Sequence, residues 1–286
     1  MNKTLCFALA AAALLMGACR QTPDESAIGA DNLPKIKIID YRGTLCQELT
    51  LKEPMPFMED NRVEDENTFE LKWPDLSAFS PETRGQLIVL AFGDSTATTL
   101  EEAAQRFLKQ SQMEDDEIAR RRKIDSITTQ PCNYKKISGG VEQNGDLLLF
   151  HTNYEGMVAF AAHGYYGYNS LIVDRKSGRV VHLEDLMDTA GIGEVMIRAL
   201  EDLVVNRDNG NTTECLFDEY KQRLPHPDGF TIDSTRSVVT AHFNPYSAQP
   251  YACGMLFVDM PIYWLSKHLQ LTPYGKEIFG PESYNQ

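Results

Sequence analysis

Short runs of mostly apolar residues, bounded by polar turn sequences, recur along the chain and predict β-strands. The first run is KIKIIDY at residues 35–41, and a denser series begins after Gly145. There DLLLFHT, MVAFAAHG, SLIVD and RVVHL are separated by the turn sequences NYEG and RKSG, which predicts an antiparallel meander. Further strands are expected at FTID, VVTAHF and MLFVDM.

Helices are predicted where the apolar spacing changes to three or four residues. In TTLEEAAQRFLKQSQ, Thr99 and Glu102 have the spacing of a capping box. EVMIRALEDLVV and TECLFDEYKQRL predict two more helices, and a short closing helix is expected after Pro261. The charged run EDDEIARRRK is expected to be a solvated helical extension, because its acids offset the basic residues 120–123. Locally paired strands with helices inserted between them predict an α+β fold with an antiparallel sheet.

Residues 1–18 have the pattern of a secretory signal peptide. Lys3 precedes an apolar run from Leu5 to Met16 that is too short to span a membrane comfortably. The ending MGAC resembles the lipobox of bacterial lipoproteins, in which the signal is cut before a cysteine that then receives a palmitate-containing lipid. This resemblance implies lipidation of Cys19, a tether at residues 19–32 and an outer-membrane anchor. The alternative is an unlipidated secreted protein.

Acidic residues outnumber basic ones, 41 against 27, which gives a net charge of −14. A surface of this sign repels nucleic acid, so no nucleic-acid partner is expected. It would attract basic partners, although solubility alone is an equally good explanation of the charge.

The cysteines outside the signal and the lipidation site predict disulfides, since an even number remains in an exported protein. These residues are Cys46, Cys132, Cys215 and Cys253. Four cysteines can pair in three ways. The expected bridges are Cys46–Cys132 and Cys215–Cys253, because each of them links neighbouring regions of the chain. No CxxC or Cys/His cluster has the spacing of a metal site, so neither a metal nor another cofactor is expected.

Two segments of the second half resemble a known family. AAHGYYGYNSLIVDRKSGRVVHLEDL, residues 161–186, is similar to a family pattern of a His-Gly strand end, a strand closing in Asp, a Ser-Gly turn and a helix entry. NPYSAQPYACGMLFVDMPIYWL, residues 244–265, is similar to its second signature. These patterns belong to the RsiV-like and PdaC-like extracellular domains, found in a lysozyme-sensing anti-sigma factor and beside a peptidoglycan deacetylase domain.

The resemblance implies a PdaC-like part at residues 33–160, an RsiV-like domain at residues 161–275 and a tail at residues 276–286. The chain departs from the family where Ala161 and Ala162 replace a glycine pair. No sigma-binding segment or deacetylase domain is recognised, so sigma-factor control and deacetylation are not expected.

The stretch HFNPYSAQPYACGMLFVDMP, residues 242–261, can be an active-site lining or a structural corner. Pro245 and Pro250 limit the backbone and remove hydrogen-bond donors, which predicts an irregular connection at a sheet edge. We expect a structural corner in which the Tyr251 ring is buried and its hydroxyl is hydrogen-bonded.

His163 is the best catalytic candidate, with Asp174 as the partner expected across a hairpin. No serine elbow, HExxH or paired-carboxylate motif accompanies it, so a histidine satisfied at a strand end is the favoured interpretation, and no catalytic residue is assigned. HGYYGYN gathers tyrosines that can stack on sugars or anchor a protein. The binding candidates are His163, Tyr165, Tyr166, Tyr168 and Tyr251.

Together these features predict a lipid-anchored protein of the cell envelope with a non-enzymatic binding domain. The family resemblance implies that its partner is a basic protein such as a lysozyme-type muramidase, or a peptidoglycan glycan. The alternative is an envelope glycan hydrolase that uses His163 and nearby acids.

Overall fold

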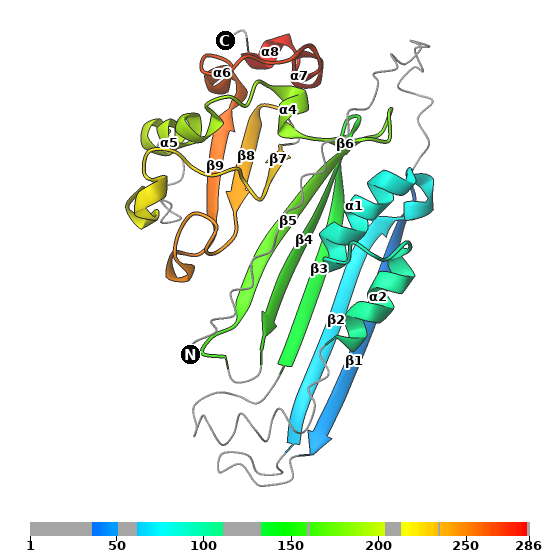
Figure 1. The fold of residues 1–286 in the computed structure, drawn as a ribbon. Coiled ribbons are helices and arrows are strands. Elements are labelled where there is room, and N and C mark those ends of the chain that lie inside the picture. Colours follow the sequence, from blue (N-terminus) through cyan, green and yellow to red (C-terminus); the bar gives the residue numbers. More distant parts are fainter. Residues whose placement is uncertain are drawn as a thin grey trace. The chain divides into compact units, whose positions relative to one another are not determined.

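The computed structural model describes residues 36–50, 62–110, 133–158, 161–203, 213–233 and 235–284, all of which belong to one compact unit. The signal, Cys19 and the tether lie outside these residues. The fold is α+β as predicted, with a larger and a smaller sheet and several helices (Figure 1). No helix in the described part of the chain has the length and apolarity needed to cross a membrane.

The larger sheet has six strands in the order β1-β2-β3-β4-β5-β6. They are β1 (Ile38–Thr50), β2 (Arg62–Pro74), β3 (Asn133–Asn144), β4 (Leu147–Met157), β5 (Tyr165–Asp174) and β6 (Val180–Val181). The pair β2 and β3 is parallel, whereas the other neighbours are antiparallel. The larger sheet is therefore mostly antiparallel, as expected, with one parallel pair that the sequence did not predict. Two parallel strands need a connection that crosses back to the end of the sheet at which the first strand begins, and the helices between β2 and β3 belong to this connection.

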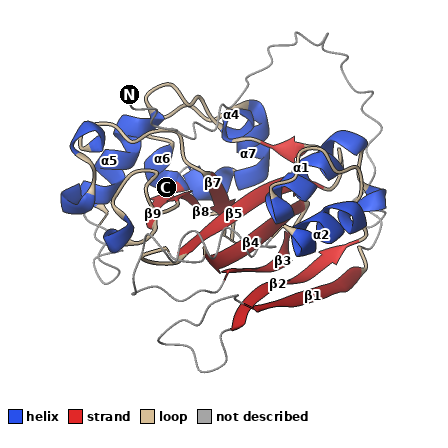
Figure 2. Ribbon diagram, turned by 60° about the horizontal axis from the view of Figure 1, so that its bottom comes forward, coloured by secondary structure: helices blue, strands red, loops and turns tan. Residues whose placement is uncertain are grey.

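Those helices are α1 (Pro81–Phe92) and α2 (Leu100–Lys109), and they cover one face of the larger sheet (Figure 2). The helix α2 begins at the predicted residue, because the Thr99 side chain accepts a hydrogen bond from the Glu102 backbone N–H. The core between these helices and the larger sheet includes Trp73, Phe107 and Phe150. Alternate residues of β4 and β5, such as Leu149, face the opposite way into a second core.

The second core surrounds the smaller sheet, whose three strands have the order β7-β8-β9. These strands are β7 (Gly229–Ile232), β8 (Val238–Phe243) and β9 (Leu256–Pro261), close to the runs predicted for them. The accompanying helices are α4 (Leu183–Leu186), α5 (Ile192–Asp202), α6 (Ile262–Leu265), α7 (Pro273–Phe279) and α8 (Pro281–Tyr284). The strands β4 and β5, on either side of the expected boundary between residues 160 and 161, are neighbours in the larger sheet.

Three local predictions were wrong. Of the strand expected at MVAFAAHG, residues 157–164, only Met157 lies in a strand among the described residues. The turn expected at NYEG, residues 153–156, lies inside β4, because the ladders with both β3 and β5 hold these residues in an extended strand. The helix expected at TECLFDEYKQRL is replaced by two short 3₁₀ turns, η4 (Thr213–Cys215) and η5 (Asp218–Tyr220). Between them the Phe217 N–H donates to the Ala248 carbonyl, which takes the chain out of a helical path.

Cys215 and Cys253 form a disulfide, which is one of the two expected pairings. It ties the η4 segment to the corner before β9. Cys46 is exposed and forms no disulfide with another described residue, whereas Cys132 lies outside the described residues. The second bridge therefore stays a prediction.

Candidate binding site

The face of the larger sheet opposite α1 and α2 is polar where the second core does not cover it. Along β2, Phe69, Leu71 and Trp73 are buried, and the residues between them are not. Since neighbouring residues of a strand point to opposite faces, the register of the sheet extends this polar row across β1 to β5. We call this surface the open face. Its side chains include Arg42, Thr44, Thr68, Glu70, Lys136, Ser138, Asn153, Glu155 and Tyr166.

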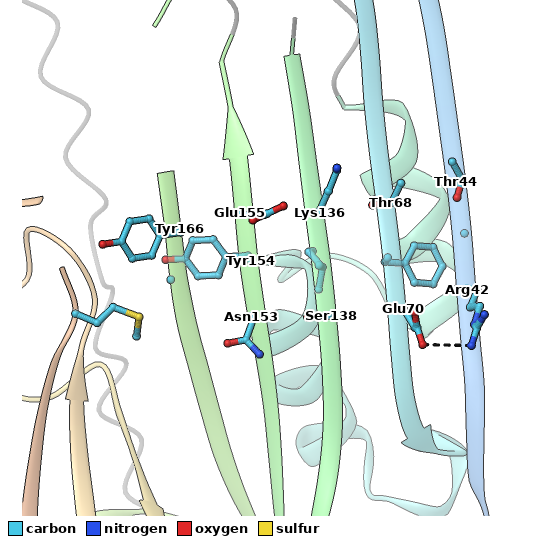
Figure 3. Close-up of a pocket in the computed structure, with 15 residues that line it drawn as sticks. Arg42, Thr44, Thr68, Glu70, Lys136, Ser138, Asn153, Tyr154, Glu155 and Tyr166 are labelled. Carbon is cyan, nitrogen blue, oxygen red and sulfur yellow. Dashed lines mark hydrogen bonds and ion pairs between the residues drawn. The ribbon is translucent and has the colours of Figure 1, made fainter. Parts of the chain in front are cut away.

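A groove of about 720 Å³ crosses the strands on this face (Figure 3). Met255, which precedes β9, contributes to its lining beside residues of β1 to β5. A second hollow of about 350 Å³ shares Glu70, Ser138 and Asn153 with the groove. Apart from Met255, the lining residues of both lie on strands of the larger sheet, which fixes their positions.

The charges at the β1 end of the groove largely neutralise one another. The Arg42 guanidinium lies 2.8 Å from an Asp40 carboxylate oxygen and 3.2 Å from Glu70, and Lys72 lies 3.7 Å from the same Glu70 oxygen. All of these side chains are substantially exposed, so the pairs contribute little to stability. Their effect is to leave no strong net charge at this end of the groove.

Four aromatic rings gather near the other end, on a surface formed by His163, Tyr166, Tyr246 and Tyr251. We call these four residues the aromatic surface. The Tyr251 ring is central: its centroid lies 4.2 Å from that of His163, 5.3 Å from Tyr166 and 5.9 Å from Tyr246. Tyr246 is 59% exposed and His163 is exposed as well. Aromatic rings presented in this way are typical of contact surfaces.

The corner that carries Tyr251 is held by polar contacts of its backbone. The buried Gln249 amide donates to the carbonyls of Cys253, at 3.1 Å, and Gly254, at 3.3 Å. Gly254 has a φ of 79°, which glycine adopts without strain. Tyr246 has a φ of 73°, a conformation rare for residues other than glycine. The disulfide and these contacts place both tyrosines rigidly.

The structure changes the role expected for Tyr251. The stretch is a corner, as predicted, but the Tyr251 ring is half-buried among surface rings, and its hydroxyl has no hydrogen bond within the described ranges. The expected buried, hydrogen-bonded ring is therefore wrong. The reason is that Gln249 and the disulfide, rather than Tyr251, hold the corner together.

Tyr168 lies apart from the aromatic surface, in a buried cluster between β5 and β8. Its ring stacks on His151 at 6.1 Å and meets the edge of His242 at 4.9 Å. Ser170 Oγ donates to the Phe230 carbonyl at 2.9 Å and lies 2.8 Å from His242 Nε2. Burial lowers the pKa of His242 to about 4 and raises the pKa of Tyr168 to about 12.

The Ser170 and His242 pair has the composition of a nucleophile and a base, but its geometry is structural. The one hydroxyl proton of Ser170 is directed to a backbone carbonyl, so Nε2–H of His242 must donate to Oγ. The imidazole is 0% exposed, and its Nδ1 has no hydrogen-bond partner in the described chain. An activated nucleophile needs its base oriented by a third group, and the structure provides none here.

The expected pairing of His163 with Asp174 is wrong. His163 lies just before the first residue of β5 and Asp174 is its last residue, which puts them roughly 30 Å apart at the usual rise of a strand. Asp174 instead accepts a hydrogen bond from the Tyr274 hydroxyl at 3.0 Å. Tyr165 is on the other side of the sheet, near Tyr154.

Sequence reasoning missed the groove, because β2, β3 and α1 were not predicted. The alternation of Phe69, Leu71 and Trp73 was an available signal for β2. Within the described residues, no group of three His, Cys, Asp or Glu side chains is placed to hold a metal ion.

No protein-family model matches this sequence, and no curated protein matches it. Solved structures do. A member of the DUF3298 family from Bacteroides fragilis has a TM-score of 0.54 and 19% identity, over 85% of this chain and 98% of that one. The chain shares the DUF3298 fold. A DUF3298 family protein from Pseudomonas aeruginosa has a TM-score of 0.48 and 15% identity, over 86% of this chain and 97% of that chain.

DUF3298 is a domain of unknown function, so the shared fold assigns no activity or partner. Neither structure is described as an RsiV-like or PdaC-like domain, and that resemblance stays an expectation.

Proposed function

We propose that this chain is a lipid-anchored envelope protein whose DUF3298-like domain binds a basic protein of the lysozyme-type muramidase class through the aromatic surface, without chemistry of its own. The observation that carries this proposal is the gathering of His163, Tyr166, Tyr246 and Tyr251 on a rigid, partly exposed corner. Tyrosine is over-represented among the residues that dominate binding energy in protein interfaces.

Charge supports a basic partner. Glu155 pairs in register with Tyr166 and is exposed, and Asp228 is exposed where it accepts hydrogen bonds from the Asn244 N–H and the Ser247 hydroxyl. With a net charge of −14 over the chain, a basic partner would be attracted before contact and would associate faster at low salt.

The arrangement of the described residues does not support the hydrolase alternative. Its dyad of His163 and Asp174 is split between the two ends of β5, and the His163 imidazole instead stacks on Tyr251 with Nδ1 2.7 Å from the Gly164 carbonyl. A ring in this position is suited to contact rather than to general-base catalysis.

Tyr251→Ala is expected to weaken muramidase binding by at least tenfold, because Tyr251 is the ring that touches the other three. The free energy of unfolding should change by only about 1 kcal/mol, since the ring is half-buried. Calorimetric titration with a basic lysozyme and thermal unfolding measure the two effects.

The matched control is Tyr263→Ala, which removes a 40% exposed tyrosine from α6, outside the aromatic surface. Its affinity should equal that of the wild type. The proposal fails if the wild-type chain does not bind a muramidase, or if both variants lose affinity equally.

Cys19→Ala is expected to release the protein from the membrane fraction, because a lipid on that thiol would be its anchor. Cys6→Ala, within the expected signal, is the matched control and should stay membrane-bound. Fractionation of cells expressing each variant gives the measurement. Equal membrane partition of Cys19→Ala and wild type would contradict lipid anchoring.

A further inference from the structure

We infer that the groove on the open face is a second binding site, and that it takes a carbohydrate chain bearing acetamido groups. The inference goes beyond the proposed muramidase contact, since it concerns a different class of ligand and the middle of the groove; Tyr166 and Glu155 belong to both surfaces. It begins from the hydrogen-bonding state of the groove's side chains.

Several polar side chains of the groove have no partner. Figure 3 marks one interaction among the residues drawn, the Arg42–Glu70 pair. The other polar side chains near the middle of the groove have neither a hydrogen bond nor an ion pair within the described ranges. They are Thr44, Thr68, Ser138, Asn153 and Glu155.

These groups offer the chemistry that sugars require. Hydroxyl and amide side chains both donate and accept hydrogen bonds, as sugar hydroxyls and acetamido groups do. Four strands, β1 to β4, contribute them, so their spacing is set by the sheet and is little changed on binding. A ligand that hydrogen-bonds to several strands at once gains from this pre-organisation.

The charges argue against a strongly ionic ligand. Arg42 is paired with Asp40 and Glu70, and Lys136 lies 4.0 Å from a Glu66 carboxylate oxygen. The cations of the groove are therefore partly neutralised, which disfavours a nucleic acid or another polyanion. A ligand that is neutral along most of its length fits this pattern better.

The end of the groove near β5 is less polar. Met255 and the Tyr166 ring line it there; on β4, Glu155 lies directly opposite Tyr166, and Asn153 lies two residues away along the strand. A thioether and an aromatic ring can cover a methyl group or the C–H face of a sugar, while the neighbouring amide bonds the carbonyl of an acetamido group. This combination is the reason for naming acetamido sugars rather than carbohydrates in general.

The second hollow extends the groove, so a bound sugar chain can continue beyond it. It shares Ser138 and Asn153 with the groove and continues past Gly140 and His151. Gly140 faces His151 in the register, and a Cβ on this glycine would come within 3.0 Å of the imidazole. Because Gly140 has no side chain, the second hollow stays open at this position. A chain of several sugar units can therefore extend from the groove into the second hollow.

Calorimetric titration of the full-length chain with oligomers of N-acetylglucosamine tests the inference. The double change Ser138→Ala and Asn153→Ala should weaken binding by roughly tenfold, because two hydrogen bonds are lost. Ser138→Trp should abolish binding by filling the groove. Both sites are exposed, so neither variant should unfold the protein.

Gln105→Ala is the matched control, because it removes an exposed amide from α2, on the covered face of the sheet. It should bind sugar as the wild type does. Cello-oligosaccharides, which lack acetamido groups, should bind more weakly than N-acetylglucosamine oligomers, and equal binding would overturn the assignment of acetamido sugars.

A wild-type chain that binds neither sugar, or a Ser138→Trp variant that binds normally, would overturn the site itself. Mass spectrometry of the recovered sugar should show intact oligomers, and cleavage would overturn a pure binding role. The same variants should keep full muramidase affinity, so a failure of the groove is distinguishable from a failure of the aromatic surface.

Discussion

Trp73→Ala is expected to lower the free energy of unfolding by about 3–5 kcal/mol, the range for large aromatic truncations in a core. The Trp73 side chain is 0% exposed in the core between the larger sheet and α1 and α2. Its ring meets Phe150 edge-on at 5.3 Å, and its N–H donates to the Gly140 carbonyl at 2.9 Å. The variant loses these contacts and leaves a cavity. Urea unfolding followed by circular dichroism measures the loss.

The chain provides a matched control, because Trp73 and Trp264 are its two tryptophans. Trp264 is half-buried on α6, where its ring contacts that of His268 at 4.2 Å. Trp264→Ala should therefore cost much less than Trp73→Ala. Trp73→Phe, which keeps most of the ring and loses the N–H donor, should fall between them. A smaller loss for Trp73→Ala than for Trp264→Ala would show that the first core is not organised around Trp73.

Local signals in the sequence predicted the elements whose ends are set by nearby residues. The helix α2 was predicted from Thr99 and Glu102, and the Glu102 N–H indeed donates to Thr99 Oγ1 at 3.1 Å. The strands β8 and β9 were predicted because they are short runs of mostly apolar residues bounded by turn residues. In these segments the local preference and the tertiary structure agree.

The elements that were missed depend on tertiary contacts. In α1 the sequence PETRGQLIVLAF carries Gly85 near its centre and exposes Val89, so its apolar residues form no clear stripe. The strand β2 was hidden by its many charged residues, although Asp65 and Asn67 are buried in it. The Asn67 amide N–H donates there to the Phe107 carbonyl near the end of α2, which partly offsets the cost of its burial.

The two candidate sites illustrate the same distinction. His163, Tyr166 and Tyr251 could be proposed individually, because aromatic residues near turns are visible in the sequence. Their contact across β5 and the corner before β9 could not be predicted. The groove was even less predictable from the sequence, since it exists only because β2 lies beside β3 in a parallel pair.

Acidification is expected to destabilise the fold through His242, by about 3 kcal/mol between pH 6.5 and pH 4. Burial lowers the pKa of His242 to about 4 in the folded chain, against 6.5 for a solvated histidine. In this window the unfolded chain binds the additional proton, so stability falls as the pH falls. Above about pH 7.5 the imidazole is neutral in both states, and the effect is absent.

The contacts of His242 show which atom would take the proton. Nε2 already donates to Ser170 Oγ, so the added proton must go to Nδ1, which is buried without a hydrogen-bond partner among the described residues. Asp228 favours the charged form, but its attraction is smaller than the cost of burial. On the other side of the Tyr168 ring, burial also lowers the pKa of His151, which Glu142 opposes, so both histidines resist charging.

His242→Gln separates this effect from other acid-sensitive groups. Glutamine stays neutral, keeps an N–H donor for Ser170 and leaves the carboxylates and His151 unchanged. Its free energy of unfolding, measured by urea titration from pH 7.5 to pH 4, should fall less steeply than that of the wild type by about 3 kcal/mol over the window. His268→Gln changes an exposed histidine and should follow the wild-type profile. Parallel profiles for His242→Gln and wild type would mean that His242 is not the buried neutral group joining β8 to β5.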